Sequence, residues 1–138
     1  MQVEPQPCNI LVVDDNAFDL SVLKELAETA VETDRVACAR SLDEAVDRVS
    51  DLQPVLVILD DYLGPVTRAP ESVVRLRQAG YANLICVATA RHDRANAGPL
   101  LRNAGVLYFD KDGIDGEWLN RMIYLARHNG ALWSIRAA

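Results

Sequence analysis

The sequence of 138 residues contains no apolar run of the ~18 residues that a membrane-spanning helix requires. Residues 1–7 lack the basic and apolar stretches of a secretory signal, and their two prolines predict a mobile lead-in. Only three cysteines occur, Cys8, Cys38 and Cys86, and they are widely spaced. We interpret them as small buried side chains in a reducing compartment rather than as disulfide partners or metal ligands. We therefore expect a cytoplasmic protein without a membrane partner.

The sequence also lacks a basic stripe. Its net charge of −6 argues against general nucleic-acid binding, and we expect no DNA binding. Residues 1–61 hold 14 acids and 4 bases, whereas residues 62–138 hold 6 acids and 10 bases. We interpret the more basic second half as ordinary solvated surface, with a docking face as the alternative.

Two short apolar runs each end in aspartates. Residues 9–13 precede Asp14 and Asp15, and residues 55–59 precede Asp60. Runs that are apolar on both faces are typical of buried parallel strands, and ligands of open α/β sheets bind beyond the carboxyl ends of such strands. Two unit charges about 4 Å apart repel by roughly 4 kcal/mol at an effective dielectric of about 20. Carboxylates clustered there need a bound cation, a nearby lysine or a raised pKa.

Strand-like and helix-like patterns alternate along the chain. Further apolar runs predict strands at 36–39, 84–88 and 106–110. Apolar residues spaced by three and four predict helices at 17–32, 41–51, 70–79 and 115–128, with a short helix from Pro99. Glycine, proline and polar residues predict loops at 64–70 and 90–98. This alternation, in a chain long enough for one domain, indicates an α/β fold whose parallel sheet has helices on both faces.

Capping residues indicate where these helices begin and end. Asn16 or Asp15 can cap the first helix. Ser41 is followed three residues later by Glu44, which is the pattern of a capping box. Glycines are expected to end two helices, at Gly80 and Gly130.

One edge of the predicted sheet gathers residues that carry chemistry. Asp14, Asp15 and Asp60 follow two of its strands, Thr89 ends a third and Lys111 ends a fourth. Carboxylate oxygens with room for water suit Mg²⁺. A hydroxyl and an ammonium beside that cation suit a phosphoryl group, and a carboxylate can itself become an aspartyl phosphate.

These motifs together resemble the receiver domain of two-component response regulators, including the chemotaxis-regulator type. The matching segments are Ile10-Leu11-Val12-Val13-Asp14-Asp15-Asn16, Val57-Ile58-Leu59-Asp60-Asp61-Tyr62-Leu63, Val87-Ala88-Thr89-Ala90 and Tyr108-Phe109-Asp110-Lys111. The resemblance covers about 8–129, so that 1–7 form a lead-in and 130–138 a tail. It implies a flavodoxin-like doubly wound (βα)5 sandwich, a five-stranded parallel sheet of order 2-1-3-4-5.

The resemblance implies a metal site. Asp60 looks like the phosphoacceptor and also a metal ligand. Asp15 looks like the direct acidic Mg²⁺ ligand, with Asp14 acting closely or through water. The backbone carbonyl of Tyr62 looks like a further ligand.

The resemblance also implies a phosphoryl site and a switch. Thr89 resembles the hydroxyl that bonds the phosphoryl oxygen, and Lys111 resembles the lysine that pairs with it. Tyr108 resembles the aromatic residue that changes orientation on phosphorylation, together with Thr89. Asp61 is interpreted as a solvated neighbour rather than a second acceptor.

Two positions depart from the family pattern: Gly64 and Asp112 each stand where the family usually has proline. These departures leave open a pseudo-receiver that binds proteins constitutively. A small Mg²⁺-dependent phosphohydrolase is a third hypothesis, but such an enzyme would need a second acidic residue at the position of Tyr62. A receiver only promotes its own phosphorylation and dephosphorylation, so we do not expect a turnover enzyme.

The partners implied are a sensor histidine kinase or histidine phosphotransfer protein and a downstream protein target. The protein could form a homodimer. The tail containing Trp133 could pack on the domain, mediate dimerisation or begin a connection to another segment. We also hypothesise that the bulky side chains of Tyr62 and Arg91 hinder the attacking water and lengthen the phosphorylated state.

Overall fold

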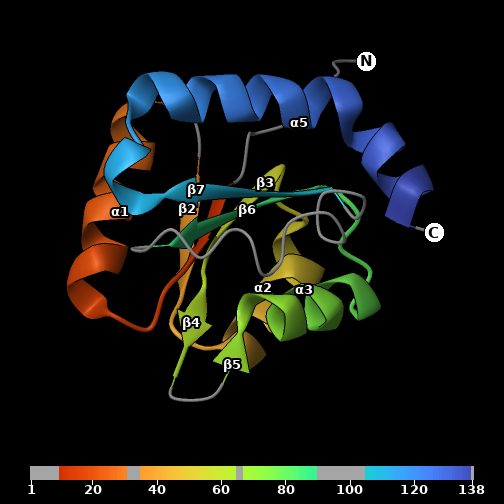
Figure 1. Cartoon of the computed structure of the whole chain (residues 1–138), viewed down its shortest axis with the longest axis horizontal. Coiled ribbons are helices and arrows are strands. Elements are labelled where there is room, and N and C mark those ends of the chain that lie inside the picture. Colours follow the sequence, from red (N-terminus) through yellow and green to blue (C-terminus); the bar gives the residue numbers. More distant parts are fainter. Residues whose placement is uncertain (1–9, 31–34, 65–66, 90–104, 138) are drawn as a thin grey trace, which may run out of the picture.

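A computed structural model describes residues 10–30, 35–64, 67–89 and 105–137, with only the backbone described for residue 30 and for 129–137. Five parallel strands form one sheet in the order β2-β1-β3-β6-β7 (Figure 1). Their bounds are Ile10–Val13 for β1, Val36–Ala39 for β2, Leu56–Asp60 for β3, Leu84–Thr89 for β6 and Val106–Asp110 for β7. Counted among themselves these strands have the order 2-1-3-4-5, which confirms the predicted topology.

Helices cover both faces of the sheet, as predicted for this fold class. Their bounds are Ala17–Ala30 for α1, Leu42–Leu52 for α2, Ala69–Gln78 for α3 and Gly116–Ala137 for α5. Helices α1 and α5 lie on one face, and α2 and α3 lie on the other (Figure 1). None of the helices in the described stretches combines the length and apolar character needed to cross a bilayer.

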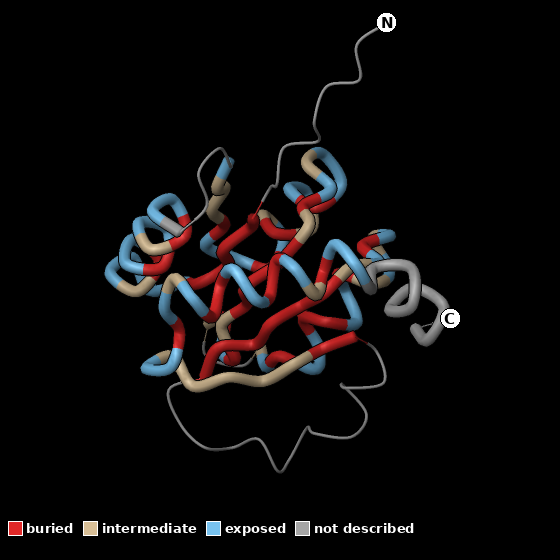
Figure 2. The backbone as a smooth tube through the Cα atoms, turned by 90° about the horizontal axis from the view of Figure 1, so that it is seen from above, coloured by how far each residue is buried: buried red, intermediate tan, exposed pale blue. Residues whose placement is uncertain are grey.

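The sheet is buried because its central strands are apolar on both faces (Figure 2). Successive strand side chains point to opposite faces, so Ile10 and Val12 join the core under α1 and α5, whereas Leu11 and Val13 join the core under α2 and α3. Burying each such side chain contributes about 1.5–3 kcal/mol. These two apolar layers hold the carboxyl ends of the strands in place.

The predicted caps are present. Asn16 Oδ1 accepts a 3.0 Å hydrogen bond from the Asp19 amide at the start of α1. Ser41 Oγ accepts a 3.1 Å bond from the Glu44 amide. Glu44 Oε1 in turn accepts from the Arg40 amide at 2.8 Å, one residue earlier than in the standard capping box.

Two expectations about boundaries were wrong. The segment 64–70, expected to be a loop, includes β5 (Thr67–Arg68), which pairs antiparallel with β4 (Tyr62–Leu63). Helix α5 continues through Gly130 to Ala137, so 130–137 are helical. A glycine inside a helix costs only about 1 kcal/mol relative to alanine, and Ala131 and Leu132 beyond it are good helix formers.

The cysteines follow the expectation only in part. Cys86 is buried in β6, whereas Cys38 on the edge strand β2 is half-buried. Cys8, the predicted loop at 90–98 and the short helix from Pro99 lie outside the described residues.

Candidate functional site

The ends of β1 and β3 bring together the carboxylates of Asp14, Asp15 and Asp60. In the register of these strands Val13 pairs with Leu59, so the residues that follow them lie side by side. One carboxylate oxygen from each of the three lies within 4.8 Å of the others. Asp14 is fully buried and Asp60 retains 13 % of its side-chain exposure. The side-chain geometry therefore concentrates three potential anions in one small volume.

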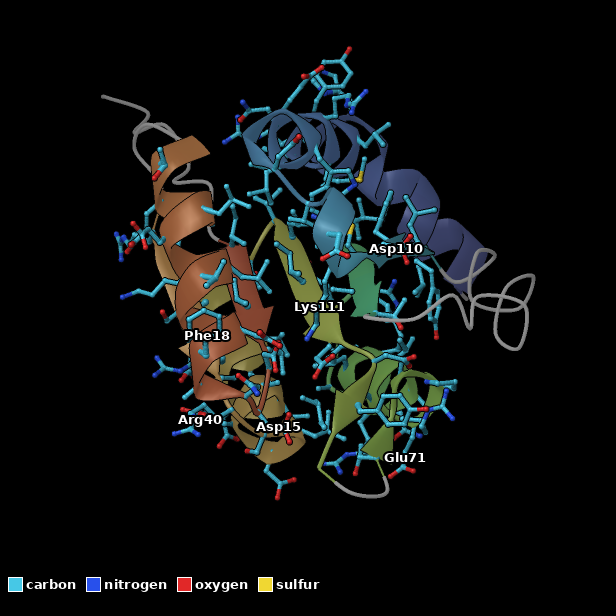
Figure 3. The ribbon with its side chains drawn as sticks, turned by 60° about the vertical axis from the view of Figure 1, so that its left-hand side comes forward. Asp15, Phe18, Arg40, Glu71, Asp110 and Lys111 are labelled. Carbon is cyan, nitrogen blue, oxygen red and sulfur yellow. The ribbon has the colours of Figure 1, made fainter. Side chains whose placement is uncertain are left out.

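Lys111, which follows the edge strand β7, supplies the compensating charge (Figure 3). Its Nζ lies 3.1 Å from Asp14 Oδ2 and 3.3 Å from Asp60 Oδ1. It also lies 3.0 Å from Oδ2 of Asp19, a residue of α1 that the sequence analysis did not include. The signal that could have identified Asp19 is its place three residues after the capping Asn16, in the first turn of the helix that starts at this edge.

The proximity of these charges shifts two pKa values. Burial, and next the charge of Asp14, raise the pKa of Asp60 to about 7, although Lys111 partly offsets them. Burial lowers the pKa of Lys111, but the hydrogen bond that it donates to Asp19 and the charges of Asp60 and Asp14 more than offset this, so its pKa lies above the usual value. Lys111 is therefore a permanent cation, and Asp60 ionises near neutral pH unless further positive charge arrives.

Asp15 is held from the opposite side by the β4–β5 hairpin. The amide of Gly64 donates a 2.9 Å hydrogen bond to Asp15 Oδ2. Gly64 has a φ of +82°, a conformation that proline cannot adopt, and proline has no amide hydrogen to donate. The glycine that departs from the expected pattern is thus the residue that orients this carboxylate.

The prediction that Asp61 is solvated was wrong, since the residue is only 2 % exposed. Its Oδ2 lies 3.8 Å from an Arg68 nitrogen, and its Oδ1 has no hydrogen-bond partner among the described residues. Side chains alternate along an extended chain, so Asp61 points away from the side on which Asp60 meets Lys111. The sequence analysis missed Arg68, because the pairing of β5 with β4 brings it to Asp61.

Several solved structures that share this fold are receiver domains. A response regulator receiver domain from Clostridium thermocellum is 21 % identical, with a TM-score of 0.76, and 91 % of this chain and 98 % of that chain are covered. A CheY-like receiver from Methanospirillum hungatei is 20 % identical, with a TM-score of 0.74 and coverages of 91 % and 98 %. The chain has the receiver fold. The signal receiver domain of a modulated diguanylate cyclase from Desulfovibrio desulfuricans G20 is 25 % identical, with a TM-score of 0.73 and coverages of 90 % and 96 %.

The receiver fold is evident in three dimensions and weak in sequence. No protein-family model matches the chain, and no curated protein matches it. The structural similarity therefore establishes the fold alone. The roles of individual residues have to be argued from the geometry of this chain.

Two further predicted residues of the receiver fold lie at the same end of the sheet. Asp60 pairs with Ala88 in the register of β3 and β6, so Thr89 follows directly beside Asp60, and it is 3 % exposed. Tyr108 pairs with Val87 on the edge strand and packs partly buried against the α2–α3 core. Burial, and next the charge of Asp61, raise the pKa of Tyr108 to about 12, so it is neutral at physiological pH.

The donor set of this receiver fold fits a magnesium ion. Asp14, Asp15 and Asp60 offer hard carboxylate oxygens close together, and Mg²⁺ accepts a few such ligands while keeping several waters. The side chain of Tyr62 is 45 % exposed, and the Arg68 guanidinium lies 4.3 Å from its ring centre. The role of the Tyr62 carbonyl as a metal ligand stays a prediction.

Proposed function

We propose that this chain is a phosphoacceptor receiver, which takes a phosphoryl group onto Asp60 from a histidine kinase or histidine phosphotransfer protein. The observation that carries the proposal is the place of the Asp60 carboxylate, which has an oxygen within 4.8 Å of oxygens of Asp14 and Asp15 and lies 3.3 Å from the Lys111 ammonium. A buried carboxylate with cationic groups at hand is suited to act as a nucleophile.

In the transfer, an Asp60 oxygen attacks the phosphorus of a phosphohistidine. A bond forms between the aspartyl oxygen and phosphorus, the phosphorus–nitrogen bond breaks, and the released imidazole takes up a proton from solvent. Mg²⁺ held by Asp14, Asp15 and Asp60 would neutralise charge on the phosphoryl oxygens. Lys111 exchanges its contact with Asp60 for one with a phosphoryl oxygen, and the Thr89 hydroxyl donates to another.

The added phosphoryl charge then changes the surface that a partner contacts. Thr89 lies at the end of β6 and Tyr108 lies on the neighbouring edge strand. A movement of Thr89 toward the phosphoryl group leaves space that the neutral Tyr108 side chain can occupy. We infer that this pair forms the switch, that a downstream protein reads it, and that the protein works in the cytoplasm.

Phosphorylation by acetyl phosphate, followed by intact-protein mass spectrometry, tests this function. We expect the mass of one phosphoryl group to be added in the presence of Mg²⁺ and not in the presence of EDTA, and Asp60→Asn to abolish it. Asp61→Asn serves as the control for the adjacent carboxylate and keeps the modification. An unmodified wild-type protein would indicate the pseudo-receiver, and steady phosphate release from a small phosphoester would indicate the hydrolase.

A further inference from the structure

Lys111 contacts three carboxylates. Its ammonium group donates hydrogen bonds to Asp14 at 3.1 Å and to Asp19 at 3.0 Å, and it forms an ion pair with Asp60 at 3.3 Å. The shortest of these contacts involves Asp19, which lies outside the group of carboxylates that could share a cation. The function proposed above uses Asp14 and Asp60 and gives Asp19 no role.

We propose that Asp19 is a positioning residue that anchors Lys111 while the lysine transfers its contact from Asp60 to the incoming phosphoryl group. The inference rests on the proposed phosphoacceptor function. Asp60 becomes an acyl phosphate, and a cation at the cluster would bind oxygens of Asp14 and Asp60. Asp19 takes part in neither event, so of the three carboxylates that contact Lys111 in the described part of the chain it is the one that can hold the lysine throughout the transfer.

Asp19 is well placed to act as this anchor. Its amide is fixed by the 3.0 Å hydrogen bond to Asn16 Oδ1, which caps α1. A carboxylate in the first turn of a helix is also stabilised by the helix dipole. The pKa of Lys111 agrees with this geometry, because burial lowers it and the hydrogen bond that Lys111 donates to Asp19 is the largest influence that raises it. Lysine has a long flexible stem, so a fixed second contact is what limits its position.

The test compares wild type, Asp19→Asn, Lys111→Met and the double variant in Mg²⁺-dependent phosphorylation by acetyl phosphate. We expect Asp19→Asn to lower the rate about tenfold, because small displacements of a catalytic group are costly. In the Lys111→Met background the same substitution should have no further effect. Glu25→Gln removes one charge from an exposed position on the same helix and should leave the rate unchanged.

A second readout requires neither metal nor phosphoryl donor. The midpoints of urea unfolding of the same four proteins, measured in EDTA, should be non-additive, because residues in direct contact couple. If the phosphorylation rate of Lys111→Met is too low to detect, the unfolding midpoints alone show whether Asp19 and Lys111 are coupled. An Asp19→Asn protein that is phosphorylated at the wild-type rate, or additive midpoints, would overturn the role of Asp19 while leaving the receiver function intact. A wild-type protein that accepts no phosphoryl group would overturn both.

Discussion

The backbone amide of Gly64 donates a 2.9 Å hydrogen bond to the carboxylate of Asp15, joining the β4–β5 hairpin to the end of β1. This contact directs one Asp15 oxygen toward the hairpin, which limits how the carboxylate can turn toward a cation. The positive φ of Gly64 is therefore connected to the metal chemistry expected of Asp15.

Gly64→Ala should separate backbone strain from the effect on metal binding. A Cβ at Gly64 meets nothing within 4 Å, so only the φ of +82° opposes the substitution. We expect a loss of about 1 kcal/mol in the free energy of unfolding, measured with urea. A severalfold weaker Mg²⁺ affinity, measured by tryptophan fluorescence, should accompany it because the Gly64 amide shifts.

Gly80→Ala is the matched control. Gly80 has a φ of +97° and also has open space around the position of a Cβ, but it lies after α3. It should lose similar stability and keep the wild-type Mg²⁺ affinity. Equal Mg²⁺ affinities in the two variants would show that the Gly64–Asp15 hydrogen bond does not tune the site.

Asp60→Asn should remove a pH dependence of stability in metal-free protein. The pKa of Asp60 is raised in the folded state to about 7, mainly by burial and by Asp14. The folded protein therefore binds a proton that the unfolded chain has released, and stability falls as the pH rises from about 4 to about 7. We expect Asp60→Asn to remove most of the pH dependence of stability in this interval. At pH 8 the variant should be more stable than wild type by roughly 1–2 kcal/mol.

Urea titrations between pH 4 and pH 8 in EDTA measure this difference. Asp43→Asn removes an exposed carboxylate that pairs with Arg75, outside the site, and should retain the wild-type slope. If Asp60→Asn shows the same slope as wild type, Asp60 does not titrate in this interval.

Tyr108 should make stability fall at alkaline pH. Burial and the charge of Asp61 raise its pKa to about 12, so the folded protein retains a phenolic proton that the unfolded chain loses near pH 10. Stability therefore declines as the pH rises from about 10 to about 12. Tyr108→Phe should reduce this decline, and Asp61→Asn should reduce it partly by removing the nearby negative charge.

Unfolding midpoints measured at pH 9 and pH 11 show the effect. Tyr124→Phe, at a side chain that is 61 % exposed, provides the comparison for loss of a phenol elsewhere. A Tyr108→Phe protein that declines as steeply as Tyr124→Phe would contradict the interpretation.

Tyr62→Asn should shorten the lifetime of phosphorylated Asp60. Tyr62 lies two residues beyond Asp60, and the Arg68 guanidinium lies 4.3 Å from the centre of its ring. A smaller side chain should admit the attacking water more readily and raise the dephosphorylation rate severalfold. Arg91→Ala, at a position outside the described residues, should act in the same direction.

Loss of the phosphoryl group after removal of acetyl phosphate can be followed by mass spectrometry. Val74→Ala, at an exposed apolar side chain of α3, controls for general surface changes. Unchanged dephosphorylation rates in both Tyr62→Asn and Arg91→Ala would show that these side chains do not protect the phosphoryl group from water.

The amino-acid sequence alone determined the sheet and the ends of its strands. Apolar runs on both faces, the capping residues Asn16 and Ser41, and the acids after β1 and β3 are local patterns, so they predict elements and their boundaries. The convergence of Asp14, Asp15 and Asp60 requires β1 and β3 to be neighbours in a parallel sheet, an order that the resemblance to receiver domains implies.

Only the tertiary structure decided the remaining contacts of the site. Asp19 joins Lys111, Gly64 joins Asp15, and Asp61 is buried beside Arg68. Each of these contacts depends on how far a side chain or hairpin reaches across segments that are distant in the chain, and no local pattern encodes that reach. The continuation of α5 past Gly130 has a similar basis, because the cost of one glycine is small beside the helix-forming tendency of its neighbours.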